Sequence, residues 1–136
     1  MLVAVVATGL LAACGGSDDG GGGELFVVYK KSGGISGINE RLICSEKRCW
    51  LTESGHPRGV EPLSAAEADR LREAFDRAEF QNLPSETGTP CADCFRYRIE
   101  YAGHSVRTEQ SALPDDARPL IAELDALVKR VHRGNT

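Results

Sequence analysis

Apolar and polar residues alternate along several stretches of the chain, as they do in β-strands that bury one face. The alternation is clearest in residues 94–101, CFRYRIEY, where Arg96, Arg98 and Glu100 point away from the aromatic and apolar side chains between them. Shorter runs rich in β-branched and aromatic residues occur at 24–30, 38–44, 48–52 and 104–109. The pattern therefore predicts about five strands.

Two other stretches have the period of a helix. Ser64 and Glu67 have the spacing of a capping box, in which each side chain binds the backbone N–H of the other residue. Apolar residues then recur at helical spacing, at Ala68, Leu71, Phe75 and Ala78. The second helix is predicted from about Asp116 to His132, with an apolar stripe at Leu120, Leu124, Leu127 and Val131.

The order of these elements is strand, strand, strand, helix, strand, strand, helix, with loops expected at 53–62 and 82–93. Hairpins followed by amphipathic helices are typical of layered α+β domains. We therefore expect an antiparallel sheet of about five strands with both helices on one face.

The first 23 residues differ in composition from the rest of the chain. Residues 1–13 are apolar and uncharged, which is typical of the apolar region of an export signal. They end in Leu-Ala-Ala before Cys14, and this ending resembles the lipobox of bacterial lipoproteins, which are cut before a cysteine that then carries lipid. A plain secretory signal is the alternative. Gly, Ser and Asp alone fill positions 15–23, so residues 14–23 form a lipidated cysteine and a flexible tether.

These segments predict one domain, residues 24–136, tethered to a membrane of the bacterial cell envelope on its extracytoplasmic side. Because Gly15 follows Cys14, the lipoprotein pattern favours the outer membrane in a cell with two membranes. The formal net charge is −4, with 16 basic residues interleaved among 20 acidic ones. Such interleaving gives no basic block, and we expect no nucleic-acid partner.

Four cysteines remain once Cys14 is assigned to lipid, and an even number in an exported domain favours disulfides. Cys44 and Cys49 stand at the two ends of a short turn, whereas Cys91 and Cys94 form a CxxC. We favour these two pairings, although three are possible by count. A four-cysteine zinc site and a thioredoxin-like redox pair are the alternatives. Both are disfavoured, because the CxxC runs into a strand and not a helix.

The sequence contains no arrangement typical of catalysis. Its three histidines, His56, His104 and His132, form no HExxH motif, and no GxSxG elbow is present. We therefore expect neither a cofactor nor enzymatic activity.

Glycines gather in residues 29–38, YKKSGGISGI, without the GxGxxG order or the Lys-Ser/Thr of a phosphate-binding loop. One interpretation is a tight turn with glycines at positive φ. The other is a partner-binding loop, because small residues let another backbone approach closely. The candidate residues of this loop are Ser32, Gly33, Gly34, Ile35, Ser36 and Gly37.

Residues 26–131 resemble the emfourin family. The resemblance is carried by the glycine segment, the helix with its exit at 80–83, the Asp93-x-Phe95-x-Tyr97 strand and the stretch LPDDARPLIAELDALV. Emfourins are small protein inhibitors of thermolysin-like zinc metallopeptidases, so the resemblance implies such a peptidase as partner. The lipid anchor and the cysteine pairs are additions to the family pattern. An envelope lipoprotein that binds another protein without inhibiting it is the alternative hypothesis.

Overall fold

The computed structural model describes residues 23–135. The predicted signal at 1–13, the lipidation site Cys14 and the tether up to residue 22 lie outside the described residues. Neither helix in the described part is long and apolar enough to cross a membrane.

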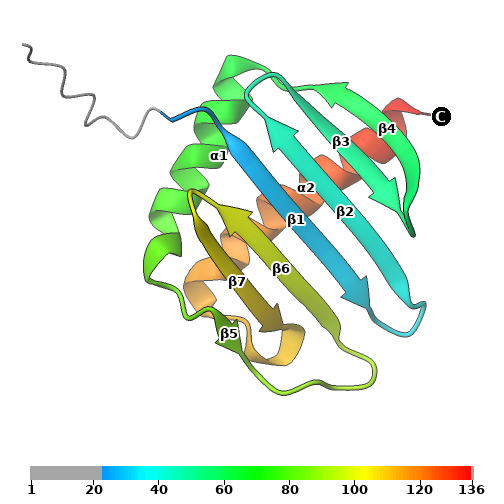
Figure 1. Ribbon diagram of the computed structural model, residues 1–136, viewed down its shortest axis with the longest axis vertical. Coiled ribbons are helices and arrows are strands. Elements are labelled where there is room, and N and C mark those ends of the chain that lie inside the picture. Colours follow the sequence, from blue (N-terminus) through cyan, green and yellow to red (C-terminus); the bar gives the residue numbers. More distant parts are fainter. Residues whose placement is uncertain (1–22, 136) are drawn as a thin grey trace, which may run out of the picture.

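A single seven-stranded sheet forms one layer of the domain (Figure 1). Its strands lie in the order β4-β3-β2-β1-β6-β7-β5, and all neighbours are antiparallel except β5 and β7. The bounds are β1 (Phe26–Gly33), β2 (Ile38–Ser45), β3 (Arg48–Glu53), β4 (His56–Pro62), β5 (Glu86–Thr87), β6 (Phe95–Tyr101) and β7 (His104–Glu109). The α+β class is confirmed, but the expected number of about five strands is too low.

The two strands missed from the sequence lie in the predicted loops. Ser54 and Gly55 both have positive φ, at 49° and 81°, and they close β3 and β4 into a hairpin with the two-residue turn that suits strand twist. Pro57 and Pro62 lack an N–H, which a strand tolerates at the edge of a sheet, and β4 is an edge strand. The two residues of β5 pair with β7 at the other edge and are too few to show a period.

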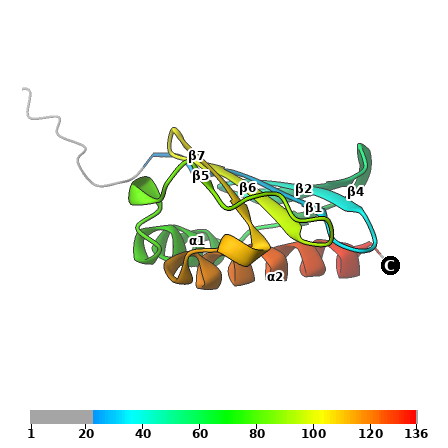
Figure 2. The same cartoon turned by 90° about the horizontal axis from the view of Figure 1, so that it is seen from below.

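The two helices, α1 (Ala65–Arg77) and α2 (Arg118–Gly134), both cover the same face of the sheet (Figure 2). The capping box is present as predicted, because Ser64 Oγ accepts from Glu67 N at 3.1 Å and Ser64 N donates to Glu67 Oε2 at 2.8 Å. The second helix begins at Arg118 and not at Asp116, since a short 3₁₀ turn (Asp115–Ala117) precedes it.

The core lies between the helices and one side of β1, β2, β3, β6 and β7. Its largest fully buried side chains come from both layers: Tyr29, Leu42, Leu51, Ile99, Phe75, Phe80, Leu120 and Leu124. The Phe75 ring stacks on Tyr101 with centroids 3.9 Å apart. We call this side of the sheet the covered face and the opposite side the open face.

Polar contacts join the covered face to each helix. Tyr29 Oη donates to Asp125 Oδ1 of α2 at 2.8 Å. At the other helix, Glu46 pairs with Arg72 and also accepts from the backbone N–H of Leu25 at 2.8 Å. The Arg72 hydrogen bond, followed by that of Leu25, holds the pKa of Glu46 below its usual range.

Candidate functional site

The glycine segment forms the tip of the β1–β2 hairpin. Ser32 and Gly33 belong to β1, and the turn itself covers residues 34–37, so the predicted six-residue loop is part strand and part turn. Gly33 faces Ile38 in the last pair of the hairpin, and Gly37 N donates to Gly34 O at 3.1 Å. We call residues 32–37 the tip.

Two of the tip glycines are required by the fold. Gly33 has a φ of 91°, and a Cβ there would lie 2.6 Å from the carbonyl oxygen of Cys94. Gly34 has a φ of 74°, and a Cβ there would collide with the ring of Phe95. Gly37, at a φ of 60°, has open space around it. The turn interpretation therefore accounts for these glycines, because each holds a left-handed conformation.

Ile35 is the residue of the tip that the turn interpretation leaves unexplained. Its side chain is 91 % exposed, more than any other large apolar side chain in the described part. Ser36 beside it is also exposed. An apolar side chain at the apex of a hairpin turn is free to contact a partner.

The tip is braced by the start of β6. Gly34 N donates to the carbonyl oxygen of Cys94 at 3.2 Å, and Phe95 N donates to Gln110 Oε1 at 3.2 Å. Lys31, just before the tip, pairs with Asp125 of α2 at 3.3 Å and lies 4.5 Å from the centre of the Phe95 ring. These contacts hold the base of the tip against both β6 and the helix layer.

The four cysteines of the domain lie in two separate pairs. Cys44 and Cys49 face each other across β2 and β3 with Cα atoms 4.1 Å apart, and Cys91 and Cys94 pair with Cα atoms 5.4 Å apart. The first pair lies beside the start of β1 and the second beside its end. Within residues 23–135, no three His, Cys, Asp or Glu side chains are grouped so as to hold a metal ion.

The three histidines lie apart, each in different surroundings. His104 Nε2 lies 2.8 Å from the carbonyl oxygen of Leu83, and His132 Nε2 lies 3.2 Å from Glu40 Oε1. His56 is exposed at the start of β4.

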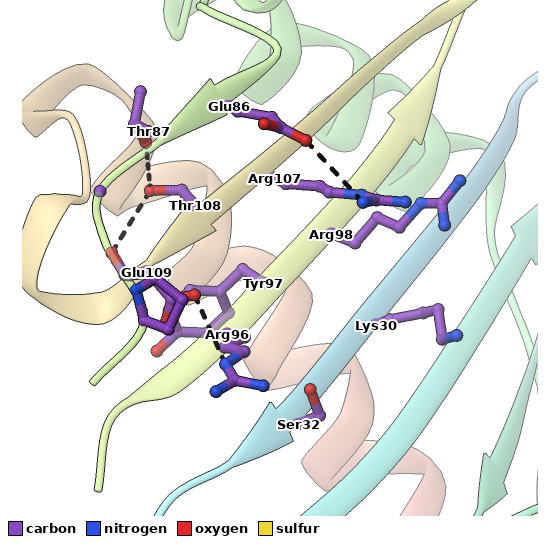
Figure 3. A pocket seen from close by; sticks show the side chains of 12 residues that line it. Lys30, Ser32, Glu86, Thr87, Arg96, Tyr97, Arg98, Arg107, Thr108 and Glu109 are labelled. Atoms are coloured by element: carbon purple, nitrogen blue, oxygen red, sulfur yellow. Dashed lines mark hydrogen bonds and ion pairs between the residues drawn. The ribbon is translucent and has the colours of Figure 1, made fainter. Parts of the chain in front are cut away.

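A second feature, which the sequence analysis missed, is a hollow on the open face. It has a volume of about 450 Å³ and lies over β1, β6, β7 and β5 (Figure 3). Cationic side chains line much of it: Lys30, Arg96, Arg98 and Arg107. The alternation in each strand indicated which residues share a face, but only the pairing of distant strands brings these four together.

The family model of Emfourin matches residues 59–125. No curated protein and no solved structure matches the chain. The matched segment runs from β4 into α2, so it includes Asp93, Tyr97 and the helix exit at 80–83, whereas the tip lies outside it. Emfourin domains are protease-inhibitor-like. The chain therefore carries a domain of the emfourin family.

Proposed function

We propose that the protein is an envelope lipoprotein whose domain inhibits a thermolysin-like metallopeptidase, with the tip as the segment that enters the cleft. The emfourin match is the observation that carries this proposal. The exposure of Ile35 at the apex of a braced hairpin supports the choice of the tip.

The geometry suits inhibition because a loop that is ordered before binding loses less conformational freedom in the complex. Hydrogen bonds to Cys94 and within the turn already hold Gly34 in place. The open space around Gly37 leaves its backbone accessible to a neighbouring chain. Ile35 would then supply the apolar anchor at the centre of the contact.

The anchor belongs to the same proposal, with Cys14 carrying lipid and residues 15–23 as the tether. Such a tether would hold the inhibitor near the membrane while leaving the domain free to turn. Replacing Cys14 by Ser should release the protein from the membrane fraction and abolish labelling by a radioactive fatty acid.

The test of inhibition is a titration of the protein into a thermolysin-like metallopeptidase while peptide hydrolysis is followed. Stoichiometric loss of activity is expected. Ile35→Asp should weaken inhibition about tenfold or more, since a central anchor contributes about 2 kcal/mol, and its melting temperature should match the wild type because the side chain is exposed.

Ala66→Asp provides the matched control, because it adds the same charge at an exposed position of α1. Inhibition by Ile35→Asp equal to that by the control would remove the tip from the contact. A wild-type protein that inhibits none of several such peptidases, and that instead co-purifies with another envelope protein, would replace inhibition by the alternative of a non-inhibitory binding lipoprotein.

A further inference from the structure

Four cations lie in register across the open face. Arg41 of β2 faces Lys30 of β1, Lys30 faces Arg98 of β6, and Arg98 faces Arg107 of β7. Figure 3 shows three of them, Lys30, Arg98 and Arg107, on successive strands. With neighbouring strands about 4.8 Å apart, the four span about 14 Å. We call them the cationic row.

Few acidic side chains of the domain pair with the cations of this row. Arg98 pairs with Glu100 at 2.6 Å, and Arg107 reaches Glu86 only at 3.8 Å. Lys30 and Arg41, both exposed, have no ion pair or side-chain hydrogen bond within residues 23–135. Like charges directly opposite each other in a sheet are destabilising, so the stability of the domain does not explain the row.

One atom of the row is also left without a partner. Arg98 Nε is buried and makes no hydrogen bond to any described residue. A buried donor of this kind costs free energy until it is satisfied. The Arg98 side chain itself lines the hollow.

The surroundings of the row resemble a protein interface more than a simple ion site. An apolar row lies next to it in register: Ile43, Trp50 and Val60 reach the surface, and Val28 at its end is only 6 % exposed. Val60 is 50 % exposed, and Trp50 is half-buried. Aromatic and arginine side chains are enriched where proteins meet, with charged groups around an apolar centre.

We infer that the open face is a docking surface for an acidic segment of a protein partner, with carboxylates on the cationic row and apolar side chains on the neighbouring row. We choose an acidic partner because its charge complements the cationic row. The chain as a whole has a net charge of −4, so it does not attract acidic proteins in general, and carboxylates are favoured only at this face. The inference goes beyond the proposed inhibition, since it rests on the open face and not on the tip.

The experiment is a calorimetric titration of the protein with a hexaglutamate peptide, with hexalysine as the control ligand. Trp50, the single tryptophan of the chain, lies on the open face and reports binding there through its emission. Lys30→Glu with Arg41→Glu should weaken hexaglutamate binding about tenfold, equivalent to about 1.4 kcal/mol. Added salt should weaken binding to the wild type.

The matched control is Arg70→Glu with Lys129→Glu, which changes the net charge equally but at exposed positions of the two helices. This variant should bind hexaglutamate like the wild type. Absence of binding to the wild type, or equal loss in both double variants, would overturn the inference. Binding to phosphatidylglycerol vesicles through the row without any binding to hexaglutamate would overturn it as well, and would make the open face a membrane surface.

Discussion

The two faces of the sheet are built from the same strands but differ in burial and in charge. On β1, Val27 and Tyr29 are almost fully buried beneath the helices. Lys30, which follows Tyr29 in the same strand, is exposed on the open face. The covered face gathers apolar side chains and paired charges, and the open face gathers like charges that are incompletely paired. The comparison teaches that one layer of helices stabilises the fold well enough to leave the second face of the sheet available for recognition.

The largest contrast should appear between two neighbours on β2. Leu42 is 1 % exposed on the covered face, and Arg41 lies exposed on the open face. Leu42→Ala should lower the free energy of unfolding by about 2–5 kcal/mol because it leaves a cavity, and Arg41→Ala should change it by no more than about 0.5 kcal/mol. Denaturation in guanidinium measures both, and similar losses in the two variants would contradict the division into two faces.

A smaller effect is expected at the polar joint between β1 and α2. Tyr29→Phe removes a hydrogen bond to a carboxylate and should cost about 1.5–3 kcal/mol. Tyr97→Phe is the matched control, because the Tyr97 ring stacks with Tyr29 but its hydroxyl has no hydrogen bond to a side chain in the described part. Equal losses in the two variants would show that the bond to Asp125 adds no stability of its own at this joint.

The same joint gives a pH dependence. Burial, followed by the charge of Asp125, raises the pKa of Tyr29 above its ordinary value. Because the folded pKa exceeds that of an unfolded tyrosine, about 10, the stability contribution is complete below pH 10 and is lost as the pH rises further. The alkaline decline in melting temperature should be shallower in Tyr29→Phe than in the wild type.

The smallest effect, with the opposite sign, is expected on the open face. Lys30→Gln relieves repulsion from Arg41 and Arg98 and should leave stability unchanged or raise it by about 0.2–1 kcal/mol. Lys31→Gln is the neighbour control and should destabilise the domain, since Lys31 pairs with Asp125. A loss of stability in Lys30→Gln would mean that the cationic row supports the fold.

The sequence predicted well those elements whose signals lie within one short segment of the chain. The capping box of Ser64 and Glu67 and the buried faces of α1 and α2 follow from spacings within one helix. The structure confirms them, except that Leu127 of the predicted stripe is only partly buried. The strand β4 was missed because its prolines and exposed residues conceal a period, although the Ser54-Gly55 turn before it is a signal for a hairpin.

The candidate sites show the limit of such patterns more clearly. The sequence drew attention to the tip because glycines are conspicuous, but it did not show that Cys94 and Phe95 are what require Gly33 and Gly34. The cationic row was missed altogether, because its two halves, Lys30 with Arg41 and Arg98 with Arg107, lie in separate hairpins that only the pairing of β1 with β6 brings together. Alternation determines the face of a residue, and only strand pairing determines its neighbours.

The place of β1 in the sheet also sets the order in which the domain can be completed during synthesis. β1, the first strand of the domain, lies at the centre of the sheet between β2 and β6. β2 follows β1 directly in the chain, whereas β6 is synthesised only after β4, α1 and β5. Hairpin contacts among β1 to β4 are local and form without long loop closure, whereas pairing with β6 must close a long loop. Until residue 101 has been synthesised, one edge of β1 has no partner strand. A nascent or truncated chain therefore exposes unpaired backbone groups in the future middle of the sheet, where another chain can pair and start aggregation.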